Sequence, residues 1–228
     1  MASKTPTQLR VGVLLTQAVQ LLDLAAVDLL GMMSKDYIAG IGVLPAEIAS
    51  LGLPVEIHYI GIKPNCAGTY IQCTAEIGIR LTASVHDASV SAGNLDILVI
   101  PGPDLKYIPD ESVSAYVRAH NDAGNVILAI CTGCYIAGYA GILDQKNVTG
   151  PKGLISDLQV KFPAVKKWDN TRRVVKDGNI WTSATKGAVT NGNDLVAAYL
   201  RENCPLPLVN AILAIADVGE RKLEYEAN

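Results

Sequence analysis

The chain has 228 residues, of which 50% are hydrophobic and 18% are charged, and its net charge is −3. This apolar content excludes a disordered chain and predicts a single domain over residues 1–228. Because the basic residues are scattered, we expect no surface for nucleic acid or for an anionic membrane, and a small molecule is the predicted substrate.

The N-terminal sequence and the cysteine count both predict a cytoplasmic protein. Residues 1–6 lack the apolar core of a signal peptide, and no apolar run approaches the roughly 20 residues that span a bilayer. The chain has five cysteines, an odd number that fits a reducing compartment better than a disulfide framework. We therefore expect free thiols.

Apolar runs and segments with helical spacing alternate along the chain. The predicted strands are residues 10–16, 55–62, 95–100 and 126–130. The predicted helices are residues 24–33, 111–123, 187–200 and 205–218. Strands that alternate with helices indicate an α/β fold, in which a mostly parallel sheet is covered by helices on both faces.

Three further stretches do not follow this alternation. Residues 39–54 are rich in Gly, Pro and apolar side chains, and are expected to form an irregular or partly helical connection suited to a dimer surface. Residues 71–82 are expected to form an added extended segment. Residues 173–183 predict a hairpin, because Asp177-Gly178 between two apolar stretches is a strong turn signal.

The sharpest signal follows the strand at residues 126–130. This apolar run leads directly into Cys131, and Ala129-x-Cys131-x-Gly133 has the spacing of the nucleophile elbow Gly-x-Ser-x-Gly, with Cys as the nucleophile. A side chain at such a corner is exposed at the carboxyl edge of the sheet. The free amides of the following helix favour its thiolate form.

Two other interpretations of Cys131 stay open. Cysteine is often buried, so Cys131 can be an inert packing residue. Cys131 and Cys134 also form a C-x-x-C pair at a helix start, which in α/β proteins can be a redox dithiol. Ligands of a parallel sheet bind outside the carboxyl ends of its strands, where the loop to Asp23, the turn at Gly102 and Cys131 are expected to converge.

Five motifs together resemble one superfamily. They are Gln-Leu-Leu-Asp at 20–23, Asp-Ile-Leu-Val-Ile-Pro-Gly at 96–102, Ala-Ile-Cys-Thr-Gly at 129–133, Gly-Ile-Leu at 141–143 with Val-Thr-Gly at 148–150, and Asp-Gly-Asn-Ile-Trp-Thr-Ser at 177–183 with Asp194. From residue 10 to about residue 200 the chain is similar to the ThiJ/PfpI superfamily, the flavodoxin-like relatives of class I glutamine amidotransferases. The resemblance implies a flavodoxin-like fold with Cys131 as the reactive cysteine and Asp23 as the acidic residue that hydrogen-bonds it. In the isonitrile-hydratase branch the acidic residue is Asp, as Asp23 is here, and a Thr follows the reactive cysteine, as Thr132 does here.

This resemblance implies a hydro-lyase of the isonitrile-hydratase type, with Cys131, Asp23 and Thr132 as catalytic residues and with no cofactor and no metal. The backbone amides of Gly102 and Thr132 are expected to line an oxyanion pocket. To donate a hydrogen bond to a thiolate, Asp23 must carry a proton, and its leucine neighbours favour a raised pKa. Each residue also has a structural interpretation: Asp23 as the N-cap of the next helix, and Thr132 and Gly102 as turn residues.

The histidines bear on the alternative functions. Superfamily members with a protease-like or glyoxalase-like arrangement place His after the elbow helix, where this chain has Val-Thr-Gly-Pro at residues 148–151. His58, His86 and His120 are expected to be structural or solvated. The alternatives are a cofactor-independent glyoxalase acting on methylglyoxal, and a redox-responsive stress protein that senses oxidation through Cys131. Because superfamily members commonly pair, a homodimer is expected.

Overall fold

The computed structural model describes residues 6–183, 191–222 and 224–225. Its central feature is a seven-stranded sheet in the order β10-β11-β7-β6-β1-β2-β5. The strands of this sheet are β1 (Leu9–Leu15), β2 (Val55–Gly61), β5 (Ala83–Ser84), β6 (Ile97–Ile100), β7 (Val126–Ala129), β10 (Val174–Asp177) and β11 (Ile180–Ser183). All neighbouring pairs are parallel except β10 and β11, which are antiparallel. The predicted mostly parallel sheet and the hairpin at residues 173–183 are confirmed.

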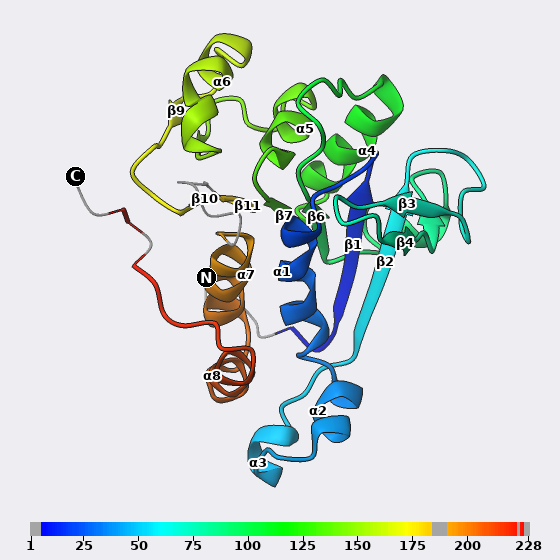
Figure 1. Ribbon diagram of the computed structural model, residues 1–228, viewed down its shortest axis with the longest axis vertical. Coiled ribbons are helices and arrows are strands. Elements are labelled where there is room, and N and C mark those ends of the chain that lie inside the picture. Colours follow the sequence, from blue (N-terminus) through cyan, green and yellow to red (C-terminus); the bar gives the residue numbers. More distant parts are fainter. Residues whose placement is uncertain (1–5, 184–190, 223, 226–228) are drawn as a thin grey trace.

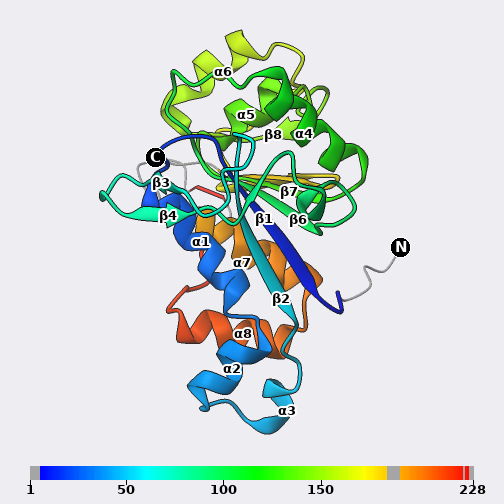
Figure 2. The ribbon, with the colours of Figure 1, turned by 90° about the vertical axis from the view of Figure 1, so that its right-hand side faces the viewer.

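Helices cover both faces of this sheet (Figure 1). They are α1 (Leu21–Gly31), α2 (Lys35–Ile41), α3 (Ala46–Ala49), α4 (Glu111–Asp122), α5 (Gly133–Tyr139), α6 (Ile155–Lys161), α7 (Asn191–Asn203) and α8 (Leu206–Ile215). Figure 2 shows α4, α5 and α6 on one side of the sheet and α1, α7 and α8 on the other, with α2 and α3 at one end. The connection at residues 39–54 is therefore partly helical, as expected. None of the described helices is long and apolar enough to cross a membrane.

Strand side chains alternate between two buried clusters, one on each face of the sheet. Val13 and Leu15 belong to the cluster that contains residues of α1, α7 and α8. Leu14 belongs to the other cluster, with residues of α4 and α5. In β6, Val99 joins the first cluster and Leu98 the second. Since both faces of the sheet are covered at its centre, strands β6 and β7 are apolar at every position, which explains their continuous apolar runs in the sequence.

Two helix boundaries bear on the predictions. Helix α1 begins at Leu21 rather than at residue 24, so Asp23 lies in its first turn, and the N-cap position is Gln20. The interpretation of Asp23 as a helix N-cap is therefore wrong. The helix expected at residues 187–200 is α7, which begins at Asn191, and residues 187–190 of that prediction lie outside the described residues.

A short hairpin outside the main sheet lies beside the start of α1. It consists of β3 (Tyr70–Gln72) and β4 (Gly78–Arg80), which pair antiparallel within the predicted extended segment. Its turn binds the chain that follows β1, because the Thr74 amide donates to the Val19 carbonyl at 3.1 Å and the Leu21 amide donates to Thr74 Oγ1 at 3.3 Å. The β3–β4 hairpin thus reaches the carboxyl edge of the sheet. A second small pair, β8 (Asn147–Val148) with β9 (Lys167–Trp168), is parallel.

Gly133 permits the close approach of α5 to β6. A Cβ at this position would overlap the carbonyl oxygen of Ile100, which accepts a hydrogen bond from the Ile130 amide at 2.9 Å. Because backbone cannot move aside as a flexible side chain can, Gly133→Ala should lower the free energy of unfolding by roughly 1–3 kcal/mol. Urea unfolding followed by circular dichroism measures this change.

Gly40→Ala is the matched control. Gly40 lies inside α2, and a Cβ there meets no atom within 4 Å. Since alanine is the better helix former, this substitution should leave the free energy of unfolding unchanged or raise it by up to about 1 kcal/mol. If Gly133→Ala were as stable as the wild type, the tight contact between α5 and β6 would be contradicted.

Candidate active site

The backbone turns sharply at Cys131, between β7 and α5. Cys131 has a φ of 55°, a left-handed conformation that costs a residue with a side chain roughly 1–3 kcal/mol. Its amide donates to Ser183 Oγ, at the end of β11, at 3.3 Å. Its side chain is half-buried, whereas the other cysteines are buried: Cys66, Cys73, Cys134 and Cys204. The corner predicted from the elbow spacing is present, and its thiol is the accessible one.

The carboxyl group of Asp23 is buried beside this corner. Asp23 is only 1% exposed, and its Oδ2 accepts a hydrogen bond from the Gly102 amide at 3.1 Å. Its Oδ1 is buried without a hydrogen-bond partner among the described residues. Burial disfavours the charged form and raises the pKa of Asp23 from 3.8 to about 7, although hydrogen bonds with the Gly102 amide and the Cys131 side chain act in the opposite direction. Near neutral pH, Asp23 is therefore poised between its two protonation states.

The side chains of Asp23 and Cys131 interact directly. The hydrogen bond between their side chains has two forms with the same total charge. Either the thiol donates to the carboxylate, or the carboxylic acid donates to the thiolate. This hydrogen bond lowers the pKa of Asp23, against the larger effect of burial. The arrangement holds a nucleophile and a proton donor within reach of one another.

Gly102 makes room for this pair at the end of β6. A Cβ on Gly102 would lie 2.7 Å from Asp23 Oδ2 and would overlap the hydroxyl of Thr132, so only glycine fits. The Gly102 amide, expected in an oxyanion pocket, is bonded to Asp23 in this structure. The Thr132 hydroxyl donates to the Pro103 carbonyl at 2.9 Å. The Thr132 amide makes no hydrogen bond to any described residue.

These four residues line one cavity of about 520 Å³, a volume within the range of small-molecule sites. The rest of its wall comes from the chain after β1, the loop after β6 and the β3–β4 hairpin: Gln17, Ala18, Val19, Gln20, Thr74, Pro103, Asp104 and Leu105. Sequence analysis did not identify Thr74, because its place depends on a contact with Leu21 across 53 positions of the chain. The structure thus brings all the predicted site residues together.

None of the histidines lines this cavity. His58 in β2 lies 2.9 Å from the Glu56 carboxylate. His120 in α4 is buried between the Asn125 side chain and the Val90 carbonyl, each at 3.2 Å. Burial lowers the pKa of His120, so it stays neutral inside the protein. A Cys-His arrangement is therefore absent from the lining of this cavity.

Cys134 lies away from the cavity, although only three positions separate it from Cys131. Its side chain is fully buried in the cluster that contains residues of α4, α5 and α6. Burial, together with the nearby Cys131, raises the pKa of the Cys134 thiol. A thiol that resists ionisation is a poor partner in disulfide exchange. This placement favours a packing role over the redox dithiol.

Comparison with known proteins identifies the family of the chain. The family model described as DJ-1/PfpI matches residues 33–197. The chain belongs to the DJ-1/PfpI family. Cys131 lies inside the matched region, and Asp23 precedes it. An isonitrile hydratase from Pseudomonas putida is 25% identical over 198 residues, which are 85% of this chain and 72% of that protein.

Solved structures show the same fold. A ThiJ/PfpI family protein from Pseudomonas syringae superposes with a TM-score of 0.69 at 19% identity, covering 96% of this chain and 79% of that one. DJ-1beta of Drosophila melanogaster also gives a TM-score of 0.69, at 18% identity, covering 93% of this chain and 100% of that one. The flavodoxin-like α/β fold and the superfamily expected from the motifs are confirmed.

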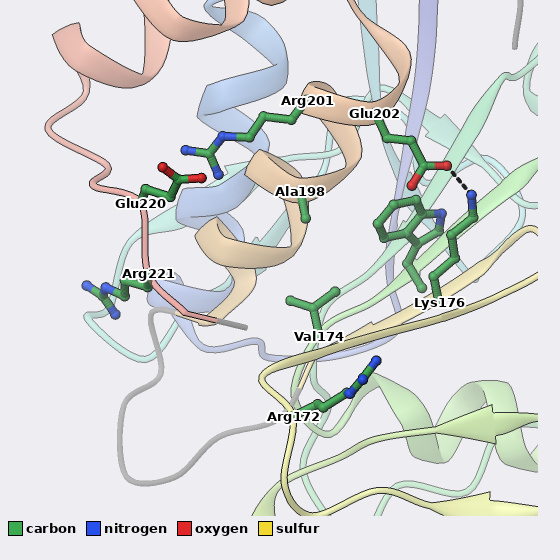
Figure 3. A pocket seen from close by; sticks show the side chains of 9 residues that line it. Arg172, Val174, Lys176, Ala198, Arg201, Glu202, Glu220 and Arg221 are labelled. Carbon is green, nitrogen blue, oxygen red and sulfur yellow. Dashed lines mark hydrogen bonds and ion pairs between the residues drawn. The ribbon is translucent and has the colours of Figure 1, made fainter. Parts of the chain in front are cut away.

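A cavity elsewhere in this DJ-1/PfpI protein, of about 470 Å³, borders β10, β11 and α7 (Figure 3). Four basic and two acidic side chains line it, and three of the basic ones have acidic partners: Lys176 pairs with Glu202, Arg172 with Glu224, and Arg221 lies 3.8 Å from Asp194. No Cys, Ser, Thr or His is among its described lining residues. The described residues also contain no cluster of His, Cys, Asp and Glu that could hold a metal ion. The Cys131 cavity is therefore the candidate active site.

Asp23 should make the stability of the protein depend on pH. Its folded pKa of about 7 lies above its ordinary value of 3.8, so between these pH values the folded state keeps a proton that the unfolded state releases. The free energy of unfolding should therefore fall as pH rises from about 4 to 7, with roughly 2–3 kcal/mol lost between pH 5 and 8. Urea unfolding at both pH values measures the loss.

Asp23→Asn is the control, because asparagine keeps the size and an acceptor for the Gly102 amide but cannot ionise. Groups that do not contact Asp23, such as His120, titrate alike in both proteins, so the difference between wild type and variant reports Asp23 together with its contact to Cys131. In the variant, the free energy of unfolding should not show the fall that ionisation of the Asp23 carboxyl causes in the wild type. Equal losses in the two proteins would show that the pKa of Asp23 is not raised.

Proposed function

We propose that this DJ-1/PfpI protein hydrates isonitriles, converting R–N≡C and water to the formamide R–NH–CHO. The observation that carries the proposal is the buried carboxyl of Asp23, with a pKa of about 7, hydrogen-bonded to the thiol at the elbow. The similarity to the isonitrile hydratase of Pseudomonas putida supports the same reaction. No cofactor or metal enters the proposed chemistry.

In the first step, the Cys131 thiolate attacks the terminal carbon of the isonitrile. The new S–C bond forms as the carboxylic acid of Asp23 gives its proton to the same carbon, which yields the thioimidate R–N=CH–S–Cys131 and leaves Asp23 as a carboxylate. A general acid is most effective when its pKa lies near the working pH. The raised pKa of Asp23 meets this condition.

In the second step, water attacks the thioimidate carbon. The Asp23 carboxylate takes a proton from this water and passes it to the nitrogen, giving R–NH–CH(OH)–S–Cys131. Loss of the hydroxyl proton to Asp23 and cleavage of the C–S bond then release the formamide. Thiolate and carboxylic acid are both restored, so the cycle consumes only isonitrile and water.

The backbone amides at the cavity have separate roles in this scheme. The Gly102 amide, which holds Asp23 Oδ2, stabilises the carboxylate that forms after each proton transfer. The Thr132 amide is assigned to the negative charge that develops on the substrate. The Thr132 hydroxyl donates to Pro103 and still has lone pairs with which to accept a hydrogen bond from the attacking water.

Turnover of isonitriles by two single variants tests the proposal. Cys131→Ala should abolish hydration because it removes the nucleophile. Asp23→Asn should lower kcat by about 10²–10⁴-fold, since the amide cannot transfer a proton. Formamide production from a panel of alkyl and aryl isonitriles, followed by liquid chromatography, measures both effects.

Cys134→Ser is the matched control for the second thiol of the C-x-x-C pair. On the elbow mechanism this variant should keep hydration within a few-fold of the wild type, with a lower melting temperature because a buried thiol is replaced by a more polar hydroxyl. If Cys134→Ser were inactive and Asp23→Asn turned over normally, a dithiol mechanism would replace the hydration mechanism. Conversion of 2-oxoaldehydes to 2-hydroxy acids, without hydration of any isonitrile, would favour the glyoxalase alternative.

A further inference from the structure

A second cavity, of about 310 Å³, adjoins the Cys131 cavity. The two share a wall, because Gln17 lines both. They also share the β3–β4 hairpin, which contributes Ile71 to the second cavity and Thr74 to the Cys131 cavity. The second cavity is otherwise lined mainly by apolar or aromatic side chains: Ile62, Cys66, Tyr70 and Leu81. We call it the hairpin cavity.

Gln17 marks the boundary between the two cavities. It follows β1 directly, and its Nε2 is buried without a hydrogen-bond partner among the described residues. A buried amide donor without a partner is costly in a folded protein. Because this atom has no exposed surface, the Gln17 side chain would have to rotate for its amide to donate to an acceptor atom of a ligand that extends from one cavity into the other.

The charges around the two cavities differ in sign. Among the described residues, the Cys131 cavity is lined by the carboxyl groups of Asp23 and Asp104 and by no Lys, Arg or His. The hairpin cavity is lined by one charged residue, Lys63, which is exposed and forms no ion pair with any described residue. An anionic group in the second cavity would be attracted to the ammonium group of Lys63.

We propose that the hairpin cavity is a second subsite, which takes an apolar substituent of the substrate that ends in an anionic group such as a carboxylate. The isocyano group then lies at Cys131, the hydrocarbon passes Gln17, and the carboxylate meets Lys63. The proposal rests on the proposed function, since it assigns the substituent R of R–N≡C. The preferred substrates are therefore isonitriles of ω-amino acids with a hydrocarbon chain long enough to join the two cavities.

The first test compares each ω-isocyanoalkanoate with its methyl ester, over a series of chain lengths. In the wild type, kcat/KM should favour the acid at the length that joins the cavities. Lys63→Gln should lower the ratio of kcat/KM for the acid to kcat/KM for the ester by about 3–10-fold, which is the effect of removing one partly solvated ion pair. Lys152→Gln is the control, because Lys152 is also exposed but lines neither cavity, and its ratio should equal that of the wild type.

The second test measures binding without turnover. Calorimetry with Cys131→Ala and the product of the preferred acid, an ω-formamidoalkanoate, should show weaker binding when Lys63→Gln is added and no change when Lys152→Gln is added. If the ratio and the affinity were both independent of Lys63 while simple isonitriles were hydrated, the subsite would be refuted and the proposed function would stand. If no isonitrile were hydrated, the proposed function would fail, and the calorimetry alone would decide whether the anion-tipped chain binds here.

Discussion

The buried carboxyl of Asp23 is the contact on which the site depends, because it joins three segments that are distant in sequence. It projects from the first turn of α1, accepts the Gly102 amide after β6, and hydrogen-bonds Cys131 after β7. A carboxylate in such a place would be costly to bury unless it were protonated or well hydrogen-bonded. The missing side chain at Gly102 serves this contact, since a Cβ there would lie 2.7 Å from Asp23 Oδ2.

Much of the fold follows from local sequence signals. The central strands were predictable because burial on both faces makes every position apolar, and the β10–β11 hairpin because Asp177-Gly178 fits a tight turn. The elbow was also predictable from local sequence, because the spacing of Cys131 and Gly133 after an apolar strand specifies a sharp corner and a close helix. The structure buries Cys134 against the sheet, in the cluster that contains residues of α4, α5 and α6.

The environment of Asp23 was harder to predict, because long-range contacts create it. The leucines beside it in sequence suggested a raised pKa, yet Leu22 is 48% exposed, and Asp23 is buried instead by segments such as the turn at Gly102, 79 positions away. The bond from the Gly102 amide to Asp23 has no local signature. The same is true of the β3–β4 hairpin, whose fold over the start of α1 places Thr74 in the active-site cavity and Ile71 in the hairpin cavity.

The central claim is that Asp23 holds a proton near neutral pH beside an accessible thiol. The most direct measurement is a carbon-13 NMR titration of protein labelled at the aspartate carboxyl groups, with Asp23→Asn to assign the resonance. The account predicts a titration of Asp23 with a midpoint near 7, which should rise when Cys131 is replaced by Ala, because the hydrogen bond with Cys131 lowers the pKa of Asp23. A single midpoint near the ordinary aspartate value of about 4, unaffected by Cys131→Ala, would contradict it.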